Sequence, residues 1–263
     1  MFCYIFAFLS ALGSIALVFA TQIHWLWLLP IFIGGFLALN LVFVVGLYIS
    51  TFFLPKEDPV EKPRNYYGII HLVCEWIMNL LRIKVEFRGM EKFPEEPFVL
   101  VSNHISNFDP VVVLAKVKGR KIAFVSKESN FKIPIAGPYI HLAGFLAIDR
   151  ENAMRAMRTI KRASELVVSE QMIMGIYPEG TRNKSGEGLL EFKEGAFLLA
   201  KRANAPVVVV TTKGTNEIAK KMILRSTKVE LEVIEIIDKE TIKDLKLSEL
   251  SAHVRESIAN ALQ

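Results

Sequence analysis

The sequence predicts an α/β domain with a mixed, largely parallel central sheet flanked by helices, preceded by a membrane-inserted helical hairpin. Two observations lead to this architecture. The first 55 residues contain no Asp, Glu, Lys or Arg and are almost entirely apolar. From about residue 84 onward, short apolar strand-like segments alternate with helix-like segments, which is the pattern of α/β proteins. A chain of 263 residues is long enough for one substantial core and an appendage.

The apolar N-terminal part consists of two runs, Phe2 to Ala20 and Trp25 to Leu54, which the sequence TQIH joins. Because about 20 helical residues cross the roughly 30 Å hydrocarbon core, each run is long enough to span a bilayer. A cleaved signal peptide is disfavoured, since the start is uncharged and a second apolar run follows directly. A shallow hairpin within one leaflet stays open as an alternative, because Pro30 and Gly34–Gly35 offer a break in the second run.

Basic residues follow the hairpin directly. Lys56, Lys62 and Arg64 come after the second run, while no charge flanks the first. The positive-inside rule therefore predicts a cell-membrane protein whose remaining chain lies on the cytoplasmic face.

We expect three structural parts. Residues 1–54 form the membrane hairpin, residues 55–83 a proline-containing linker and an amphipathic helix, and residues 84–263 the α/β domain. In the last part, the segments rich in Val, Ile and Phe are expected as strands and those with helical apolar spacing as helices. The expected strands are 84–91, 97–104, 121–127, 144–150, 171–177, 206–214 and 228–237, and the expected helices are 110–119, 151–169, 195–204 and 245–262.

Charge is unevenly distributed along the chain. The net charge is +5, yet residues 226–263 contain 5 basic and 8 acidic side chains, which leaves +8 on residues 56–225. A cationic region beside an apolar hairpin suits anionic lipid head groups or phosphorylated substrates. Because no RNA-binding aromatic motif accompanies it, we expect no nucleic-acid partner. The two cysteines, Cys3 and Cys74, have neither disulfide nor zinc-ligand spacing and fit a reducing compartment.

The stretch SNHISNFD, residues 102–109, contains the first candidate site. Its plainest interpretation is a helix start, in which Asp109 caps a helix that begins at Pro110 and His104 is incidental. In the alternative, Asp109 accepts a hydrogen bond from one imidazole nitrogen of His104 while the other nitrogen faces a substrate hydroxyl. His104 would then be a general base, and no G-x-S-x-G nucleophile motif occurs in the chain to compete for that role.

A second polar cluster, YPEGTRN, follows the expected strand 171–177. Gly180 permits a close backbone approach, Thr181 offers a hydroxyl and Arg182 can bind a phosphate through two parallel hydrogen bonds. Glu179 cannot bind a phosphate itself, so we expect it to position an arginine or the loop backbone. Taken alone, this segment also fits an ordinary surface turn.

Two further charged groups also follow strand-like segments. Asp149 and Arg150 end the segment GFLAIDR, and Lys127 ends KIAFVSK. Asp149 and Arg150 alone fit a surface salt bridge. Because the carboxyl ends of parallel strands share one edge of a sheet, where α/β proteins bind ligands, one base and several cations are expected to converge there.

The four blocks SNHISNFD, GFLAIDR, YPEGTR and APVVVV, in this order, resemble the glycerophospholipid acyltransferases, and most closely the bacterial 1-acylglycerol-3-phosphate acyltransferases. The resemblance covers about residues 85 to 215 and implies a glycerol-phosphate acyltransferase-like fold. It also implies transfer of a fatty acyl group from acyl-CoA or acyl carrier protein to the sn-2 hydroxyl of lysophosphatidic acid. No metal or other cofactor is implied, and the expected partners are membrane lipids and these substrates.

The resemblance also implies roles by position. His104 corresponds to the catalytic base and Asp109 to its charge-relay partner, while Pro206 marks the fourth block, which is linked to binding of the acyl donor. Two departures, Ala147 in place of a larger residue and a missing second proline in APVVVV, leave the chain-length and acceptor preference open. Binding of the acceptor phosphate is implied for Arg150, Glu179, Gly180, Thr181 and Arg182, with Lys127 nearby.

Two alternatives to this function stay open. The first is an acyltransferase that acts on glycerol 3-phosphate or on another lysophospholipid. The second is a non-catalytic membrane protein that binds anionic lipids through its cationic region.

Overall fold

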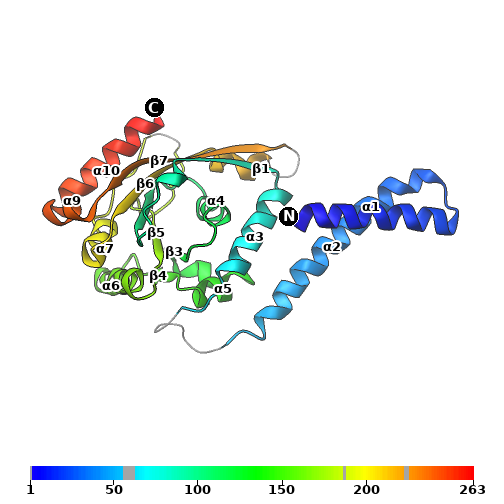
Figure 1. The fold of residues 1–263 in the computed structure, drawn as a ribbon, viewed down its shortest axis with the longest axis horizontal. Helices are drawn as coiled ribbons and strands as arrows, with labels where there is room; N and C mark the ends of the chain where they lie inside the picture. The colour runs from blue at the N-terminus through cyan, green and yellow to red at the C-terminus, as the bar shows by residue number, and fades with distance from the viewer. Residues whose placement is uncertain (1, 56–62, 186–187, 222–224) are drawn as a thin grey trace.

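The structure is a computed structural model that describes residues 2–55, 63–185, 188–221 and 225–263. Lys56 and Lys62, on which the predicted orientation partly rests, lie outside these ranges. A helical hairpin projects from one side of an α/β domain (Figure 1). The elements are, in chain order, α1 (Phe2–Thr21), η1 (Trp25–Trp27), α2 (Leu28–Thr51), α3 (Tyr67–Leu80), β1 (Ile83–Arg88), η2 (Met90–Lys92), β2 (Val99–Ser102), α4 (Asp109–Lys116), β3 (Ile122–Lys127), η3 (Glu128–Lys132), α5 (Ala136–Leu142), β4 (Leu146–Ile148), α6 (Ala153–Ser169), β5 (Ile173–Ile176), α7 (Gly195–Ala203), β6 (Val207–Lys213), η4 (Thr215–Glu217), α8 (Ile218–Lys221), β7 (Thr227–Ile237), α9 (Lys239–Asp244) and α10 (Leu247–Leu262).

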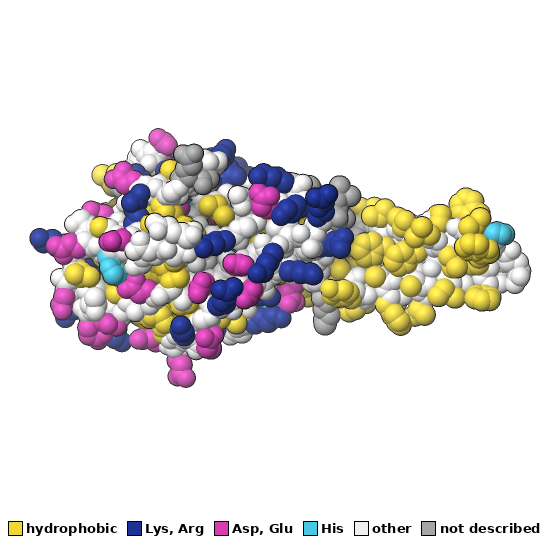
Figure 2. All heavy atoms as spheres, turned by 90° about the horizontal axis from the view of Figure 1, so that it is seen from above, with side chains coloured by type: hydrophobic (Ala, Val, Ile, Leu, Met, Phe, Trp, Pro, Cys, Tyr) yellow, Lys and Arg dark blue, Asp and Glu magenta, His cyan; other side chains and the backbone are white. Residues whose placement is uncertain are grey.

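The two N-terminal helices form the predicted hairpin. By length and composition, α1 and the segment Trp25–Thr51 are each apolar and long enough to cross a membrane. Pro30 does not break α2, because it lies in the first helical turn, where backbone N–H groups have no partner within the helix. Figure 2 shows that hydrophobic side chains cover the hairpin and that Lys and Arg side chains gather on the adjoining surface of the domain.

Polar contacts dock the hairpin onto the α/β domain. The Trp76 indole of α3 donates to the Asn40 side chain of α2 at 2.9 Å, and the Cys3 thiol of α1 donates to the Trp76 carbonyl at 3.6 Å. The hydroxyls of Ser50 and Tyr139 lie 2.6 Å apart and join the end of α2 to α5. The apolar face of α3 is part of the main core, so this helix packs on the domain rather than acting as a loose linker.

The central sheet has seven strands in the order β1-β7-β6-β2-β5-β3-β4. Strands β6, β2, β5, β3 and β4 are parallel, whereas β7 is antiparallel to β6 and parallel to β1. Figure 1 shows α3, α4 and α5 on one side of the sheet and α6, α7 and α10 on the other. The predicted mixed, largely parallel sheet flanked by helices is therefore confirmed, and its carboxyl-terminal edge gathers the loops that follow β2, β3, β4, β5 and β6.

A glycine in the middle of the sheet makes room for an aromatic ring. Gly175 of β5 pairs with Phe124 of β3, and a Cβ built on Gly175 would lie 2.2 Å from the nearest ring carbon of Phe124. The Phe124 ring therefore lies across the β5 backbone. It also stacks on the ring of Tyr177, two residues beyond Gly175, with 5.6 Å between the ring centroids.

The Gly175→Ala substitution is expected to lower the free energy of unfolding by about 1–3 kcal/mol, because the added methyl displaces a ring in a packed core. Chemical denaturation of the full chain in detergent measures this change. Gly68→Ala is the matched control, since Gly68 lies in α3 and a Cβ there meets no atom within 4 Å. A similar loss in both variants would contradict the role of Gly175.

Candidate active site

The candidate site begins where β2 delivers His104 into a loop at the carboxyl-terminal edge of the sheet. Its Nδ1 lies 2.7 Å from Oδ2 of Asp109, whose side chain is fully buried. Because a carboxylate only accepts hydrogen bonds, Nδ1 carries the proton in this contact. Nε2 then holds the free lone pair, and it has no hydrogen-bond partner among the described residues. This is the tautomer that a general base requires.

Asp109 organises the loop as well as the imidazole. The same Oδ2 atom accepts hydrogen bonds from the backbone N–H groups of Ile105 at 2.8 Å and Ser106 at 2.9 Å. Helix α4 begins at Asp109, but these donors lie in the loop before the helix rather than in its first turn. Asp109 is therefore not an ordinary helix cap, and its contact with His104 is part of the loop structure.

The strand β6 supplies further polar groups that the sequence interpretation missed. The Thr215 hydroxyl, fully buried after the end of β6, donates to Oδ1 of Asp109. The Asn103 side chain accepts from the Thr212 N–H at 2.8 Å and donates to the Thr212 carbonyl at 2.9 Å. The only signal in the sequence is the change from an apolar run to TTKGT at the end of this strand.

The loop after β5 holds the backbone of His104 at both of its polar groups. Glu179, which is 3% exposed, accepts the His104 N–H through Oε1 at 2.7 Å. Its Oε2 accepts the N–H of Leu190 at 3.3 Å. The N–H of Asn183 in turn donates to the His104 carbonyl at 2.7 Å. Glu179 thus contacts loop backbone rather than an arginine.

An aromatic ring covers one face of the imidazole. The ring of Tyr177 stacks on His104 with 4.2 Å between centroids and 15° between planes. With Nδ1 bonded to Asp109 and one face covered by Tyr177, the His104 side chain is 15% exposed. A substrate hydroxyl can therefore reach Nε2 from a restricted direction only.

Three predicted cations follow the ends of neighbouring strands. Lys127 ends β3, Arg150 follows β4 and Arg182 lies in the loop after β5, so all three lie at the same edge of the sheet as His104. None of the three side chains makes a hydrogen bond or ion pair in the described part of the chain. Partial burial lowers the pKa of Arg150, but a guanidinium stays protonated at neutral pH.

The expected surface salt bridge of this segment is present for Asp149 but does not involve Arg150. Asp149 pairs instead with Arg155 of α6 at 3.2 Å.

In the loop after β5, Gly180 has φ of 67°, a left-handed conformation that favours glycine, and Thr181 is exposed. Arg150 and Arg182 are consequently available to an anionic ligand.

The structure does not bring Pro206 to this edge. It precedes β6, and its carbonyl accepts the N–H of Val99 at the start of β2 at 2.9 Å. Because β6 has seven residues, Pro206 lies on the order of 20 Å along the strand from the edge that holds His104.

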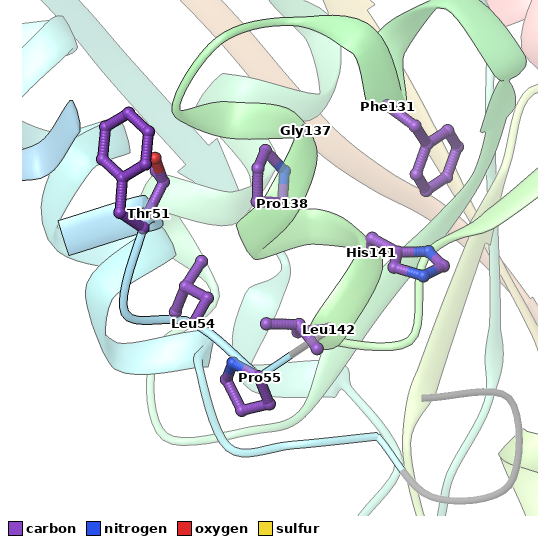
Figure 3. Close-up of a pocket in the computed structure, with 9 residues that line it drawn as sticks. Thr51, Leu54, Pro55, Phe131, Gly137, Pro138, His141 and Leu142 are labelled. Carbon is purple, nitrogen blue, oxygen red and sulfur yellow. The ribbon is translucent and has the colours of Figure 1, made fainter. Parts of the chain in front are cut away.

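A mostly apolar hollow of about 600 Å³ lies at the base of the hairpin, outside the polar cluster. Figure 3 shows side chains from the end of α2 on one side and from α5 on the other. The lining residues are Thr51, Phe52, Leu54, Pro55, Phe131, Gly137, Pro138, His141 and Leu142.

Burial raises the pKa of Glu179 above its ordinary value of 4.5, although the N–H groups of His104 and Leu190 oppose this shift. A raised native pKa means that the folded state binds more protons than the unfolded state above pH 4.5. We therefore expect the stability of the wild type, relative to Glu179→Gln, to fall as the pH rises from about 4.5 toward neutrality. Thermal unfolding of both proteins over this pH range checks the trend. The exposed Glu91→Gln variant is the control, and a pH-independent difference for Glu179→Gln would contradict the expectation.

Comparisons with known proteins agree with this geometry. The family described as Acyltransferase matches residues 84–213. The 1-acyl-sn-glycerol-3-phosphate acyltransferase alpha of Bos taurus is 31% identical over 193 residues, which are 72% of this chain and 67% of the bovine one. The 1-acyl-sn-glycerol-3-phosphate acyltransferase of Haemophilus influenzae is 30% identical over 185 residues, which are 67% of this chain and 76% of the relative.

A solved structure is similar over most of the chain. The crystal structure of the 1-acyl-sn-glycerophosphate acyltransferase from Thermotoga maritima superposes with a TM-score of 0.64 at 27% identity, and the match covers 84% of this chain and 87% of the other. The fold, the order of the motifs and these relatives agree, and the chain belongs to the acyltransferase family that includes the 1-acyl-sn-glycerol-3-phosphate acyltransferases.

Proposed function

We propose that this protein is a 1-acylglycerol-3-phosphate O-acyltransferase, which transfers a fatty acyl group from a thioester to the sn-2 hydroxyl of lysophosphatidic acid and forms phosphatidic acid. The observation that carries this proposal is the His104–Asp109 pair, which leaves Nε2 of His104 without a partner among the described residues. It lies at the sheet edge where Lys127, Arg150 and Arg182 also have no described side-chain partner. The activity named for the bacterial and mammalian relatives supports it.

The chemistry requires a base and then an acid at the same nitrogen. The acceptor hydroxyl oxygen attacks the thioester carbonyl carbon, and its proton moves to Nε2 of His104 as the new C–O bond forms. Asp109 stabilises the resulting imidazolium through Nδ1. When the tetrahedral intermediate collapses, the C–S bond breaks and the proton moves from Nε2 to the departing thiolate.

The acceptor phosphate is the natural ligand for the unpaired cations at this edge. One guanidinium group can donate two parallel hydrogen bonds to two phosphate oxygens, so Arg150 and Arg182 suit a phosphate monoester. Lys127 adds a further positive charge. The backbone of Gly180 allows a close approach of the loop to the ligand. The glycerol hydroxyl would then be presented to Nε2 of His104.

The hairpin fits insertion into the cell membrane with the domain on the cytoplasmic face. Exposed apolar side chains cover α1 and α2, and Trp25 and Trp27 near the tip are 66% and 56% exposed. Arg64, the described residue of the basic set after the hairpin, agrees with this orientation. The hollow at the hairpin base offers an apolar path for a lipid chain between the bilayer and the domain. A soluble donor, acyl-CoA or acyl carrier protein, would approach from the cytoplasm.

A direct assay tests the proposal. Purified protein in detergent is incubated with lysophosphatidic acid and with matched acyl-CoA or acyl carrier protein donors, and products are identified by mass spectrometry. We expect phosphatidic acid with at least one donor. Product formed only with glycerol 3-phosphate, or with no acceptor of this class, would refute the assignment.

Replacing the base should nearly abolish transfer. His104→Ala is expected to lower kcat by about 10²- to 10⁴-fold, the usual contribution of a general base. Asp109→Asn should reduce kcat less than His104→Ala but by at least about tenfold, because an amide cannot accept the same set of hydrogen bonds or stabilise an imidazolium. Steady-state kinetics in detergent measure both changes.

The control for Asp109 is Asp238→Asn, because Asp238 caps α9 by accepting the N–H of Thr241 at 2.7 Å. Asparagine caps helices nearly as well as aspartate, so this variant should keep wild-type kcat. Near-wild-type turnover in Asp109→Asn would show that Asp109, too, has only a structural role.

The phosphate assignment predicts a selective effect on acceptor binding. Arg182→Lys and Arg150→Ala should raise the KM for lysophosphatidic acid about 10-fold or more, since a hydrogen bond to a charged group contributes roughly 1.5–3 kcal/mol. The KM for the acyl donor should change less. Arg88→Ala is the control, because Arg88 is exposed on β1 and pairs with Glu86. If only the donor KM rises, these arginines bind the donor instead.

A further inference from the structure

Three aromatic rings, one in β3 and two in the loops after β5 and β2, form a stacked column that ends at the candidate base. Phe124 of β3 stacks on Tyr177 with 12° between planes, and Tyr177 stacks on His104 with 15° between planes. Gly175 lets the Phe124 ring lie on the β5 backbone, so the column rests on the centre of the sheet. Tyr177 is consequently held between a buried ring and the imidazole.

The hydroxyl of Tyr177 does not explain this arrangement. It is buried and has no hydrogen-bond partner among the residues that the structure describes. A buried hydroxyl without a partner is unfavourable. Burial and the nearby Asp109 raise the pKa of Tyr177 well above its ordinary value, so this hydroxyl stays protonated at neutral pH. The ring is thus the part of the Tyr177 side chain that has a described contact with the candidate base.

The ring lies where it can respond to charge on the imidazole. The face of an aromatic ring is electron-rich and attracts a cation within about 6 Å of its centroid. The centroids of Tyr177 and His104 are 4.2 Å apart. Asp109 contacts Nδ1 of the imidazole, and Glu179 contacts the backbone N–H of His104, so Tyr177 is the described group that covers a face of the ring.

We propose that Tyr177 is a positioning residue for the transfer reaction, whose ring fixes the plane of the His104 imidazole and stabilises the imidazolium that forms when the acceptor hydroxyl loses its proton. This inference rests on the proposed role of His104 as the general base. The stack with neutral imidazole directs Nε2 toward the acceptor. The attraction strengthens as the proton arrives, so the ring favours the transition state over the ground state.

The test compares Tyr177→Leu, which removes the ring, with Tyr177→Phe, which removes the hydroxyl alone. Tyr177→Leu should lower kcat by about 5- to 30-fold, as expected for a desolvated cation–π contact, with the KM values of donor and acceptor nearly unchanged. Tyr177→Phe should keep at least about half of the wild-type kcat. If both variants lose the same activity, the hydroxyl is the functional group and the proposal is wrong.

A double-mutant cycle shows whether Tyr177 acts through the base. In the His104→Ala background, Tyr177→Leu should cause no further loss, since there is no imidazole left to orient or stabilise. A loss of the same size in both backgrounds would overturn the proposal, because it would mean that the ring supports only the scaffold. Phe145→Leu is the control for removal of a buried ring, since Phe145 is 5% exposed and its ring lies tilted against Phe124 rather than stacked on His104.

A spectroscopic measurement separates this inference from the proposed function. In histidine-labelled protein, the ring proton between the two nitrogens of His104 should resonate upfield in the wild type and Tyr177→Phe relative to Tyr177→Leu, because it lies over an aromatic face. The His104→Ala spectrum assigns the signal. An identical resonance in all three proteins would refute the stack, whereas the absence of transferase activity in the wild type would refute the proposed function.

Discussion

A buried carboxylate with no cation beside it holds the candidate site together. Glu179 joins the loop after β5 to the loop after β2 by accepting the His104 N–H at 2.7 Å, and Asn183 closes the same junction from the other side. These two bonds fix the backbone of His104, while Asp109 and Tyr177 fix its side chain. The imidazole is therefore held in place before any substrate arrives, and preorganised groups of this kind contribute most to enzymatic rate.

Because hydrogen bonds rather than ion pairs stabilise the two buried carboxylates, the cations at the sheet edge are available to a ligand. Asp109 and Glu179 receive hydrogen bonds from backbone N–H groups, an imidazole and the hydroxyl of Thr215, and within the described ranges neither pairs with Lys or Arg. These hydrogen bonds offset part of the cost of burying the two carboxylates, and for Glu179 burial still outweighs them and raises its pKa. As a consequence, Arg150 and Arg182 are not used as partners of the buried carboxylates and can bind an anionic ligand.

Local sequence distances predicted part of this site and could not predict the rest. His104 and Asp109 are five residues apart, so one turn brings them together, and the apolar hairpin follows from composition alone. Thr215 is 106 residues from Asp109, and only the strand order β6-β2-β5 makes them neighbours. The sequence predicted a strand at 228–237 but not that this strand, β7, is antiparallel to β6. Pro206 belongs to a matched block, yet it lies at the opposite end of its strand.

The contacts of Trp76 with α1 and α2 set the position of the α/β domain relative to the hairpin. A flexible tether would let the domain tumble above a bilayer and meet lipid head groups at any height. Here hydrogen bonds join the hairpin directly to the domain, so insertion of the hairpin as proposed would set the height of His104 above the lipid surface. The search for the acceptor would then be lateral diffusion in two dimensions. Each lipid head group would then reach the candidate base at the same depth in the bilayer.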